Sequence, residues 1–146
     1  MTKILSLNTS LFLTCFLSMI SLNASANPEG GQVVSGNINI QQESQTKLGI
    51  TQTSQKGIIN WQKFNINSNE HTQFYQPSNT SITLNRVVTN EPSKILGKLS
   101  ANGRLFIVNQ NGILFGKNAQ VDVAGLVASV HDIKDRDFLN GKFDFS

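Results

Sequence analysis

The sequence predicts an all-β fold, and three observations support this prediction. From residue 27 onward the chain contains 15 Asn and 11 Gln, together with many Ser, Thr and Gly residues, all of which are poor helix formers. Its apolar positions are rich in Val, Ile and Phe, which suit a pleated and half-buried surface. These apolar residues occur in short runs, most of them separated by Gly, Asn or Pro. Strands this short cannot bury an apolar face alone, so we expect them to stack on neighbouring strands.

The N-terminal segment, positions 1–26, has the layout of a secretory signal peptide. Lys3 is its only charged residue, and positions 11–20 are mostly apolar. Ala24 and Ala26 supply the small residues that a signal peptidase requires. Polar residues interrupt the apolar stretch, whereas a transmembrane helix needs about 20 predominantly apolar residues. We therefore predict transport by the general export machinery and cleavage by signal peptidase after Ala26, so that the mature chain begins at Asn27.

The predicted mature chain, residues 27–146, is long enough for one domain and carries little charge. It contains 11 basic and 9 acidic residues, a net charge of +2, with no run of like charge. Nucleic-acid binding is therefore not expected. The only cysteine, Cys15, lies in the predicted signal peptide. The mature chain therefore has no disulfide within itself, and its core and backbone hydrogen bonds must hold it together.

Nine short apolar or alternating runs are the expected strands. In chain order they are residues 33–34, 38–40, 58–59, 64–66, 82–84, 105–108, 113–115, 121–123 and 126–130. Reversing hairpins, as in a β-sandwich, could join the runs of the first half. From residue 95 onward, corners of only a few residues separate the runs. We interpret residues 105–115 and 121–128 as parts of two successive coils of a parallel β-solenoid, each about 20 residues long.

The most informative corner follows the run at 105–108. The motif consists of Asn109, Gln110, Asn111, Gly112, Ile113, Leu114, Phe115 and Gly116. Asn-Gly is the dipeptide that most readily adopts positive φ, so the motif predicts a strand, a tight corner and another strand. Residues 101–103 and 117–119 predict two further corners. Asn side chains at such corners can bond backbone amides that the turn leaves unpaired and can stack from coil to coil, which accounts for the abundance of Asn.

The sequence predicts no catalytic residue, cofactor or metal site. Asp135 and Asp137 flank Arg136 and are the only close acidic pair, the kind of pair that acts in glycosidases. We interpret this segment instead as a solvated charged turn. His71 and His131 lie far apart in the sequence, with no cysteine or tight acidic cluster near either, so a metal site is not expected. No Gly-Lys-Ser or Gly-Lys-Thr phosphate loop occurs.

The large aromatic side chains have two possible roles. Those at Trp61, Phe64, Phe74 and Tyr75 could form a carbohydrate platform, but their spacing favours filling of the core. A second group lies near the end of the sequence and has the pattern of strand residues without a partner; it consists of Phe138, Leu139, Phe143 and Phe145. No polar terminal cap, which an isolated solenoid needs, follows them. We therefore interpret the chain as truncated at its C-terminal end.

Five ordered blocks resemble the N-terminal secretion domain of two-partner secretion exoproteins of the filamentous haemagglutinin type, also called the haemagglutination activity domain. The blocks are residues 30–36, 59–66, 84–88, 95–97, and 109–116 followed by 125–129, and they cover nearly the whole mature chain. Gln110 departs from the family pattern, because the family corner has Asn-Pro-Asn-Gly and proline would fix φ near about −65°. No second Asn-Pro-Asn corner occurs, and residues 76–81 occupy the region where some members have one.

The resemblance implies a right-handed parallel β-helix (solenoid) with an N-terminal β cap. It also implies export to the periplasm of a Gram-negative cell, recognition there by the periplasmic domains of a dedicated outer-membrane transporter, and release to the cell surface. The motif from Asn109 to Gly116 is then expected to matter for secretion, either by building the corner or as the element that the transporter contacts, and the structural role is favoured because Asn commonly stabilises such corners. The domain is also expected to nucleate folding of a passenger that could contact a host surface. The alternative is a self-sufficient carbohydrate-binding or adhesive β-solenoid module. A neighbouring gene for such a transporter would favour secretion.

Overall fold

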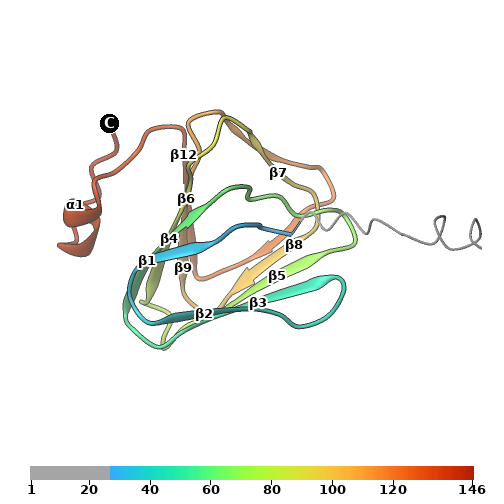
Figure 1. Cartoon of the computed structure of the whole chain (residues 1–146), viewed down its shortest axis with the longest axis horizontal. Helices are drawn as coiled ribbons and strands as arrows, with labels where there is room; N and C mark the ends of the chain where they lie inside the picture. Colours follow the sequence, from blue (N-terminus) through green and yellow to red (C-terminus); the bar gives the residue numbers. More distant parts are fainter. Residues whose placement is uncertain (1–26) are drawn as a thin grey trace, which may run out of the picture.

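Residues 27–146 are described by the structure, which is a computed structural model (Figure 1). The predicted signal peptide, with Ala24 and Ala26, lies outside the described residues. Twelve strands and one short helix form within this range. The strands are β1 (Gln32–Ser35), β2 (Ile38–Gln42), β3 (Lys47–Gln52), β4 (Lys56–Trp61), β5 (His71–Tyr75), β6 (Ile82–Val87), β7 (Ser93–Ile95), β8 (Lys98–Ala101), β9 (Arg104–Val108), β10 (Ile113–Phe115), β11 (Gln120–Asp122) and β12 (Gly125–Ser129), and the helix is α1 (Asp135–Leu139).

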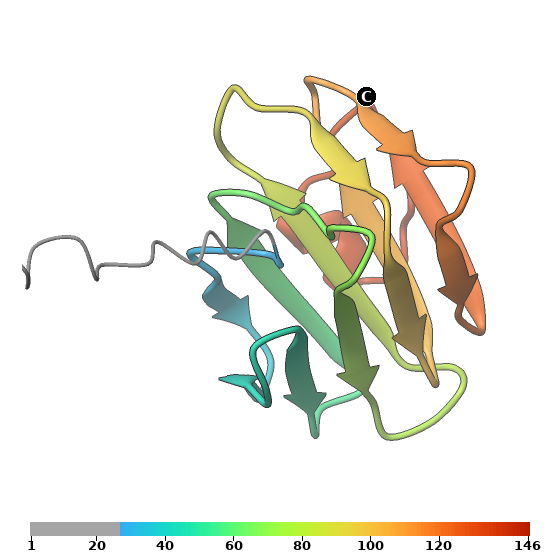
Figure 2. The ribbon, with the colours of Figure 1, turned by 90° about the vertical axis from the view of Figure 1, so that its right-hand side faces the viewer.

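The strands form the three walls of a right-handed parallel β-helix of about four coils (Figure 1). One wall has the strand order β1-β4-β6-β9-β12, a second has the order β11-β8-β5-β3-β2, and in the third β10 pairs with β7. Figure 2 shows the strands of successive coils lying side by side along the axis. The predicted all-β solenoid is therefore confirmed. In the two large walls, every strand of a middle coil has a neighbour on both sides.

The registers between stacked strands confirm the predicted coil length and correct the division into strands. Leu105 pairs with Leu126, and this spacing matches the expected coil of about 20 residues near the C-terminal end. The spacing is longer in the middle of the domain, where His71 pairs with Lys98. The last coil contains three strands rather than two, because β11 lies between β10 and β12 and pairs with β8.

Four strands, β3, β5, β7 and β8, lie outside the predicted runs. They carry several polar residues, as in the sequence His-Thr-Gln-Phe-Tyr of β5, so apolar runs alone did not mark them. The run predicted at residues 64–66 does not form a strand. Its only β-type backbone pairing is an isolated bridge between Ile66 and Ile95. These four strands are therefore stabilised by backbone pairing with a neighbouring coil, and a search for apolar side chains does not detect them.

The N-terminal end of the solenoid is closed by two antiparallel strands. β1 pairs antiparallel with β4, and β2 pairs antiparallel with β3, whereas all the other strand pairs are parallel. The register of β1 shifts between Val33 and Ser35, and such a bulge hinders the pairing of a further strand at this edge. The N-terminal β cap is thus confirmed. At the other end, β10, β11 and β12 each pair with one strand only.

The interior is mainly apolar and confirms the core role of three of the four aromatic residues. Trp61, Phe64 and Phe74 are each at most 1% exposed and belong to the main core cluster. Tyr75 is 38% exposed, so its assignment to the core was wrong. Successive residues of a strand point to opposite faces, and since Phe74 points inward, Tyr75 must point to solvent.

Polar side chains line the corner between the two large sheets and stack from coil to coil. The Gln76 amide nitrogen donates to Thr83 Oγ1 at 3.0 Å, and the Thr83 hydroxyl donates to Gln52 Oε1 at 2.7 Å. In the next coil, Asn102 Oδ1 accepts from the Gln76 backbone N–H at 2.7 Å, and the Gly103 N–H donates to Gln76 Oε1 at 2.8 Å. The predicted corner at residues 101–103 is confirmed, and so is the stacking of amide side chains at corners.

The C-terminal segment, residues 130–146 and called the tail below, differs from the prediction. Its aromatic residues do not form strands: Phe138 lies in α1, while Phe143 and Phe145 lie in irregular backbone. Leu139 ends the helix and is 38% exposed. The predicted solvated turn is wrong as well, because Asp135 and Asp137 form the first turn of this helix.

The tail folds back over the outer face of the sheet that contains β4, β6 and β9 (Figure 1). Phe138 is fully buried there, and its ring packs edge-on against Phe106 with centroids 5.7 Å apart. The Lys56 ammonium donates to the backbone oxygen of Leu139 at 2.8 Å and so joins the tail to β4. The tail therefore covers the side of the solenoid rather than its last coil. Phe138 thus finds its apolar partner on this outer face and not on a neighbouring strand.

Candidate functional site

The predicted corner is a hydrogen-bonded β-turn between β9 and β10. The Gly112 N–H donates to the Asn109 carbonyl at 3.1 Å, and the Asn111 N–H donates to the Asn109 side-chain oxygen at 2.9 Å. Gly112 has φ of 108°, as expected for a glycine that closes this corner. Gln110 occupies the second turn position, where proline is favoured in type I and II turns. Gln110 therefore lies at a turn position that would also suit the proline of the family pattern.

Asn109 holds the corner from inside the protein. Its side chain is fully buried, and its amide nitrogen donates to the Glu91 carbonyl at 2.9 Å and to Ser93 Oγ at 3.0 Å. Its backbone N–H donates to the Ser129 carbonyl at 3.0 Å. Asn109 thus joins its own coil to the coils before and after it. Asn109 therefore presents no exposed surface to a partner in this structure.

The exposed residues of the corner are Gln110 and Asn111. The Asn111 amide nitrogen donates to the Thr89 carbonyl at 2.8 Å, which fixes the corner against the preceding coil. The side chain of Gln110 forms no hydrogen bond with the described residues, and its backbone N–H also has no partner among them. Gln110 is therefore free to contact a partner, whereas Asn111 combines a structural bond with an exposed surface.

The second half of the motif forms β10 and the turn after it. Ile113 and Phe115 pack against the core cluster, while Leu114 points outward and is 56% exposed. The Gly116 N–H donates to the Ile95 carbonyl at 2.8 Å, which continues the stacking on the coil before. The eight residues of the motif therefore do not form one contact surface, because strand alternation divides them between core and solvent.

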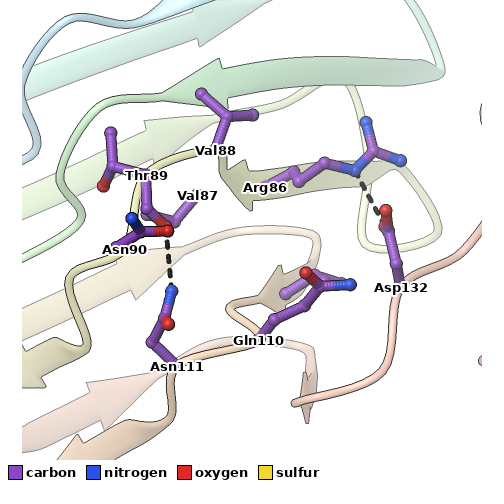
Figure 3. Close-up of a pocket in the computed structure, with 9 residues that line it drawn as sticks. Arg86, Val87, Val88, Thr89, Asn90, Gln110, Asn111 and Asp132 are labelled. Atoms are coloured by element: carbon purple, nitrogen blue, oxygen red, sulfur yellow. Dashed lines mark hydrogen bonds and ion pairs between the residues drawn. The ribbon is translucent and has the colours of Figure 1, made fainter.

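A pocket of about 270 Å³ lies beside the corner (Figure 3). Its lining combines β6 and the loop after it, the end of β9 with the corner, and the start of the tail. The lining residues are Arg86, Val87, Val88, Thr89, Asn90, Val108, Gln110, Asn111 and Asp132. In Figure 3 the Gln110 side chain extends toward the side of the pocket where Arg86 and Asp132 lie. Three separate segments must therefore be folded for this pocket to exist.

Arg86 forms the far wall of the pocket and holds the tail. Its Nε lies 2.8 Å from Asp132 Oδ1, and its Nη2 donates to Asp135 Oδ1 and to the Ile133 carbonyl, both at 2.7 Å. Its Nη1 donates to Asn60 Oδ1 at 3.2 Å. Burial lowers the pKa of Arg86, but the hydrogen bonds to the two aspartates outweigh burial and raise the pKa above its ordinary value.

The cluster around Arg86 was not predicted from the sequence. One signal was present: a charged residue occupies an outward position in an otherwise apolar and amide-rich strand. Its partners could not be identified from spacing, because Asp132 is 46 residues away in sequence. Asp135, interpreted as solvated, is one of these partners. Within residues 27–146 no group of three acidic, His or Cys side chains could hold a metal ion, and no helix of this range is long and apolar enough to span a membrane.

Asn27, the predicted first residue of the mature chain, is buried against the solenoid. It is 1% exposed, its side-chain amide donates to the Thr46 carbonyl at 3.3 Å, and its Oδ1 accepts from the Thr72 hydroxyl at 2.9 Å. Thr46 precedes β3 and Thr72 lies in β5. The residue at the predicted cleavage site is thus fixed to two coils.

The fold is a parallel β-solenoid with an antiparallel N-terminal cap, and the comparisons identify its family. Residues 24–145 match the family described as the TPS secretion domain, where TPS denotes two-partner secretion. Because this match covers most of the chain, the chain belongs to the TPS secretion domain family. It is a secretion-targeting domain of a two-partner secreted exoprotein that passes through the periplasm and is served by an outer-membrane transporter.

The chain is similar to particular proteins of Haemophilus influenzae. It is 38% identical to the crystallised secretion domain of HMW1, with a TM-score of 0.78 over 82% of this chain and 32% of that one. It is 34% identical over 124 residues to a heme/hemopexin-binding protein of strain KW20 / Rd, covering 85% of this chain and 14% of the relative. Another heme/hemopexin-binding protein is 35% identical over 107 residues, covering 73% and 12%. The chain thus spans about an eighth of the length of these curated relatives.

Proposed function

We propose that the transporter's periplasmic domains recognise this domain at the pocket beside the corner. The observation that supports this choice is the difference in exposure between residues of the motif. Asn109 is fully buried, whereas Gln110 and Asn111 are exposed and line the pocket. In this proposal the asparagines build the corner and Gln110, with its neighbours across the pocket, makes the contact. Recognition would then depend on a folded structure rather than on the motif as a linear sequence.

The proposal includes the route to the cell surface. The chain is exported by the general export machinery, signal peptidase cleaves after Ala26, and the mature protein begins at Asn27. Burial of Asn27 between two coils supports a boundary at this position. After transport the domain reaches the cell surface at the head of an adhesin-type exoprotein of the haemagglutinin class, and any contact with a host surface is made by the passenger. The domain itself has no catalytic role in this proposal.

We also propose that the domain nucleates folding of the β-helix. The cap closes one end, whereas β10, β11 and β12 leave one edge unpaired at the other end. Val121 and Leu126 of this last coil stack on the fully buried Leu99 and Leu105, yet they are 39% and 36% exposed. The apolar interior is therefore open at this end, and edges of this kind can pair with the strands of a further coil.

Two measurements on the same variants test the recognition site. Binding of the purified domain to the periplasmic domains of its outer-membrane transporter is measured together with the denaturation midpoint. Gln110→Ala should weaken binding and leave the midpoint unchanged, whereas Asn109→Ala should lower both. Asn118→Ala, at an exposed turn away from the pocket, is the matched control. Parental binding by a stable Gln110→Ala variant would contradict the proposed contact.

A further inference from the structure

The corner pocket contains polar atoms without a partner, and the only charged one among them in the described residues is a carboxylate oxygen. Asp132 uses Oδ1 for both of its bonds, to Arg86 Nε at 2.8 Å and to the Ile133 N–H at 2.7 Å. Its Oδ2 accepts no hydrogen bond from the described residues, and the side chain is 39% exposed. The side-chain amides of Asn90 and Gln110 are likewise exposed and form no hydrogen bond within residues 27–146. The pocket therefore offers one carboxylate oxygen and two amide oxygens to a ligand.

The charge balance of the pocket favours a cation. The Arg86 guanidinium donates four of its five N–H groups to Asp132, Asp135, the Ile133 carbonyl and Asn60, so it offers little to an anion. One arginine against two aspartates leaves the cluster with a residual negative charge. Lys134, which follows in the tail, lines a different cavity and not the corner pocket.

The remaining walls suit the aliphatic part of a long side chain. Val87, Val88 and Val108 line the pocket, and Val88 is 49% exposed. Lysine and arginine place their methylene groups along apolar surface and keep the charged end among acceptors. A volume of about 270 Å³ can hold one such side chain but not a folded element.

From these observations we propose that the corner pocket binds a lysine or arginine side chain of the transporter's periplasmic domains. The side chain lies along Val88, and its charged end donates to Asp132 Oδ2 and to the amide oxygens of Asn90 and Gln110. Arg86 is a positioning residue in this site, because it fixes Asp132 and with it the tail. This inference rests on the proposed function and specifies the chemistry of the partner.

The test compares two aspartates that share Arg86: Asp132 lines both the corner pocket and the neighbouring cavity, whereas Asp135 lines only the neighbouring cavity. Asp132→Asn removes the carboxylate from the pocket, and we expect the affinity for the purified transporter domains to fall about 10-fold to 100-fold, as for loss of a hydrogen bond to a charged group. Asp135→Asn removes the same charge from the guanidinium cluster without altering the lining of the corner pocket, so its affinity should fall less than that of Asp132→Asn; equal losses would mean that net charge, and not a contact with Asp132 Oδ2, governs binding. Binding of the parent should weaken with salt, and binding of Asp132→Asn should depend less on salt.

A second variant covers the case in which Asp132→Asn loosens the tail. Gln110→Lys places a competing ammonium in the pocket at an exposed residue without hydrogen bonds, so the domain should keep its stability and lose affinity. Unchanged affinity and salt dependence in Asp132→Asn, together with weakened binding in Gln110→Ala and Gln110→Lys, would overturn this inference while leaving the proposed function intact. Absence of binding by the parent domain would overturn the proposed function and this inference together.

Discussion

The indole N–H of Trp61 donates a 2.9 Å hydrogen bond to the side-chain oxygen of Asn85 in the interior of the solenoid. Both residues are fully buried and lie on neighbouring strands, β4 and β6. The Asn85 amide nitrogen lies within 3.4 Å of the Thr83 and Phe106 carbonyls. A polar pair in this position is tolerated because its side-chain polar atoms all have partners.

Replacement of Asn85 by leucine tests the strength of this pair. Asn85→Leu has similar volume but leaves the Trp61 N–H buried without an acceptor, and we expect a loss of about 1–3 kcal/mol in the free energy of unfolding. In a double-mutant cycle with Trp61→Phe, the two losses should add to more than the loss in the double variant. Simple additivity in denaturant titrations would show that the hydrogen bond contributes nothing.

Asn109→Ala should destabilise the domain through the corner. The substitution leaves the Asn111 N–H without its acceptor and Ser93 without its donor, so we expect a loss of about 1–3 kcal/mol. Asn118→Ala, at the exposed corner before β11, should change stability by less than about 0.5 kcal/mol. Equilibrium unfolding of the two variants decides the point, and equal losses would mean that burial of Asn109 has no special effect.

Two other positions of the corner should respond in opposite directions. Gln110→Pro restores the family residue at a backbone N–H that has no partner among the described residues, and it should be neutral or stabilise by about 0.4–1 kcal/mol. Gly112→Val should cost on the order of 1–3 kcal/mol. No atom lies within 4 Å of the position that a Cβ of residue 112 would occupy, so this cost measures backbone strain at positive φ alone. A destabilised Gln110→Pro variant would contradict the assigned turn geometry.

Stability should decrease in mild acid because of His71. Its neutral ring donates from Nε2 to Ser100 Oγ, since the Ser100 hydroxyl itself donates to Gln73 Oε1 at 2.6 Å. Burial lowers the pKa of His71 first, and the charges of Lys98 and Lys47 lower it further, while Glu43 acts in the opposite direction. A lowered folded-state pKa means that the stabilisation is present above the unfolded-state pKa of about 6.5 and is lost as pH falls through the folded-state value.

The pH prediction is checked by unfolding free energies between about pH 5 and 8, measured for the parent and for His71→Gln. Glutamine keeps a donor near Ser100 but cannot be protonated in this range. The difference between the two proteins should therefore vary with pH, and the parent should lose more stability in acid. Parallel profiles would show that His71 does not contribute.

N-terminal sequencing of exported protein tests the predicted cleavage. The sequence should begin Asn-Pro-Glu-Gly, because Ala24 and Ala26 fit the small pockets of signal peptidase. Ala26→Arg should block processing. Ser25 lies between the two alanines, so Ser25→Thr is the matched control and should be processed like the parent. An intact Met1 on exported protein would contradict the prediction.

Local features of the sequence were sufficient to predict the corner, most of the core and the coil length. Asn-Gly fixes a turn by its own backbone preferences, and the short apolar runs require stacking. Local sequence features did not predict those parts of the structure that depend on a residue far away in the sequence. Phe138 was expected in a strand, but it lies in a short helix that packs against the outer face around Phe106. The place of Asp132 in the pocket depends on its bond to Arg86, which lies far away in the sequence. Tyr75 was misassigned because two adjacent aromatic residues in a strand must point to opposite sides.

The pairing between successive coils affects how a longer β-helix that continues this domain would fold. Each strand of the parallel stack pairs with a strand of the coil just before it, as Ile113 does with Ser93 and Lys98 with His71. The loop that must close to add a coil therefore has a similar size at every step, and so does its entropic cost. Contact order stays local as the solenoid lengthens, so a long exoprotein of this design can order itself coil by coil, in the direction of its synthesis, without a search across the whole chain.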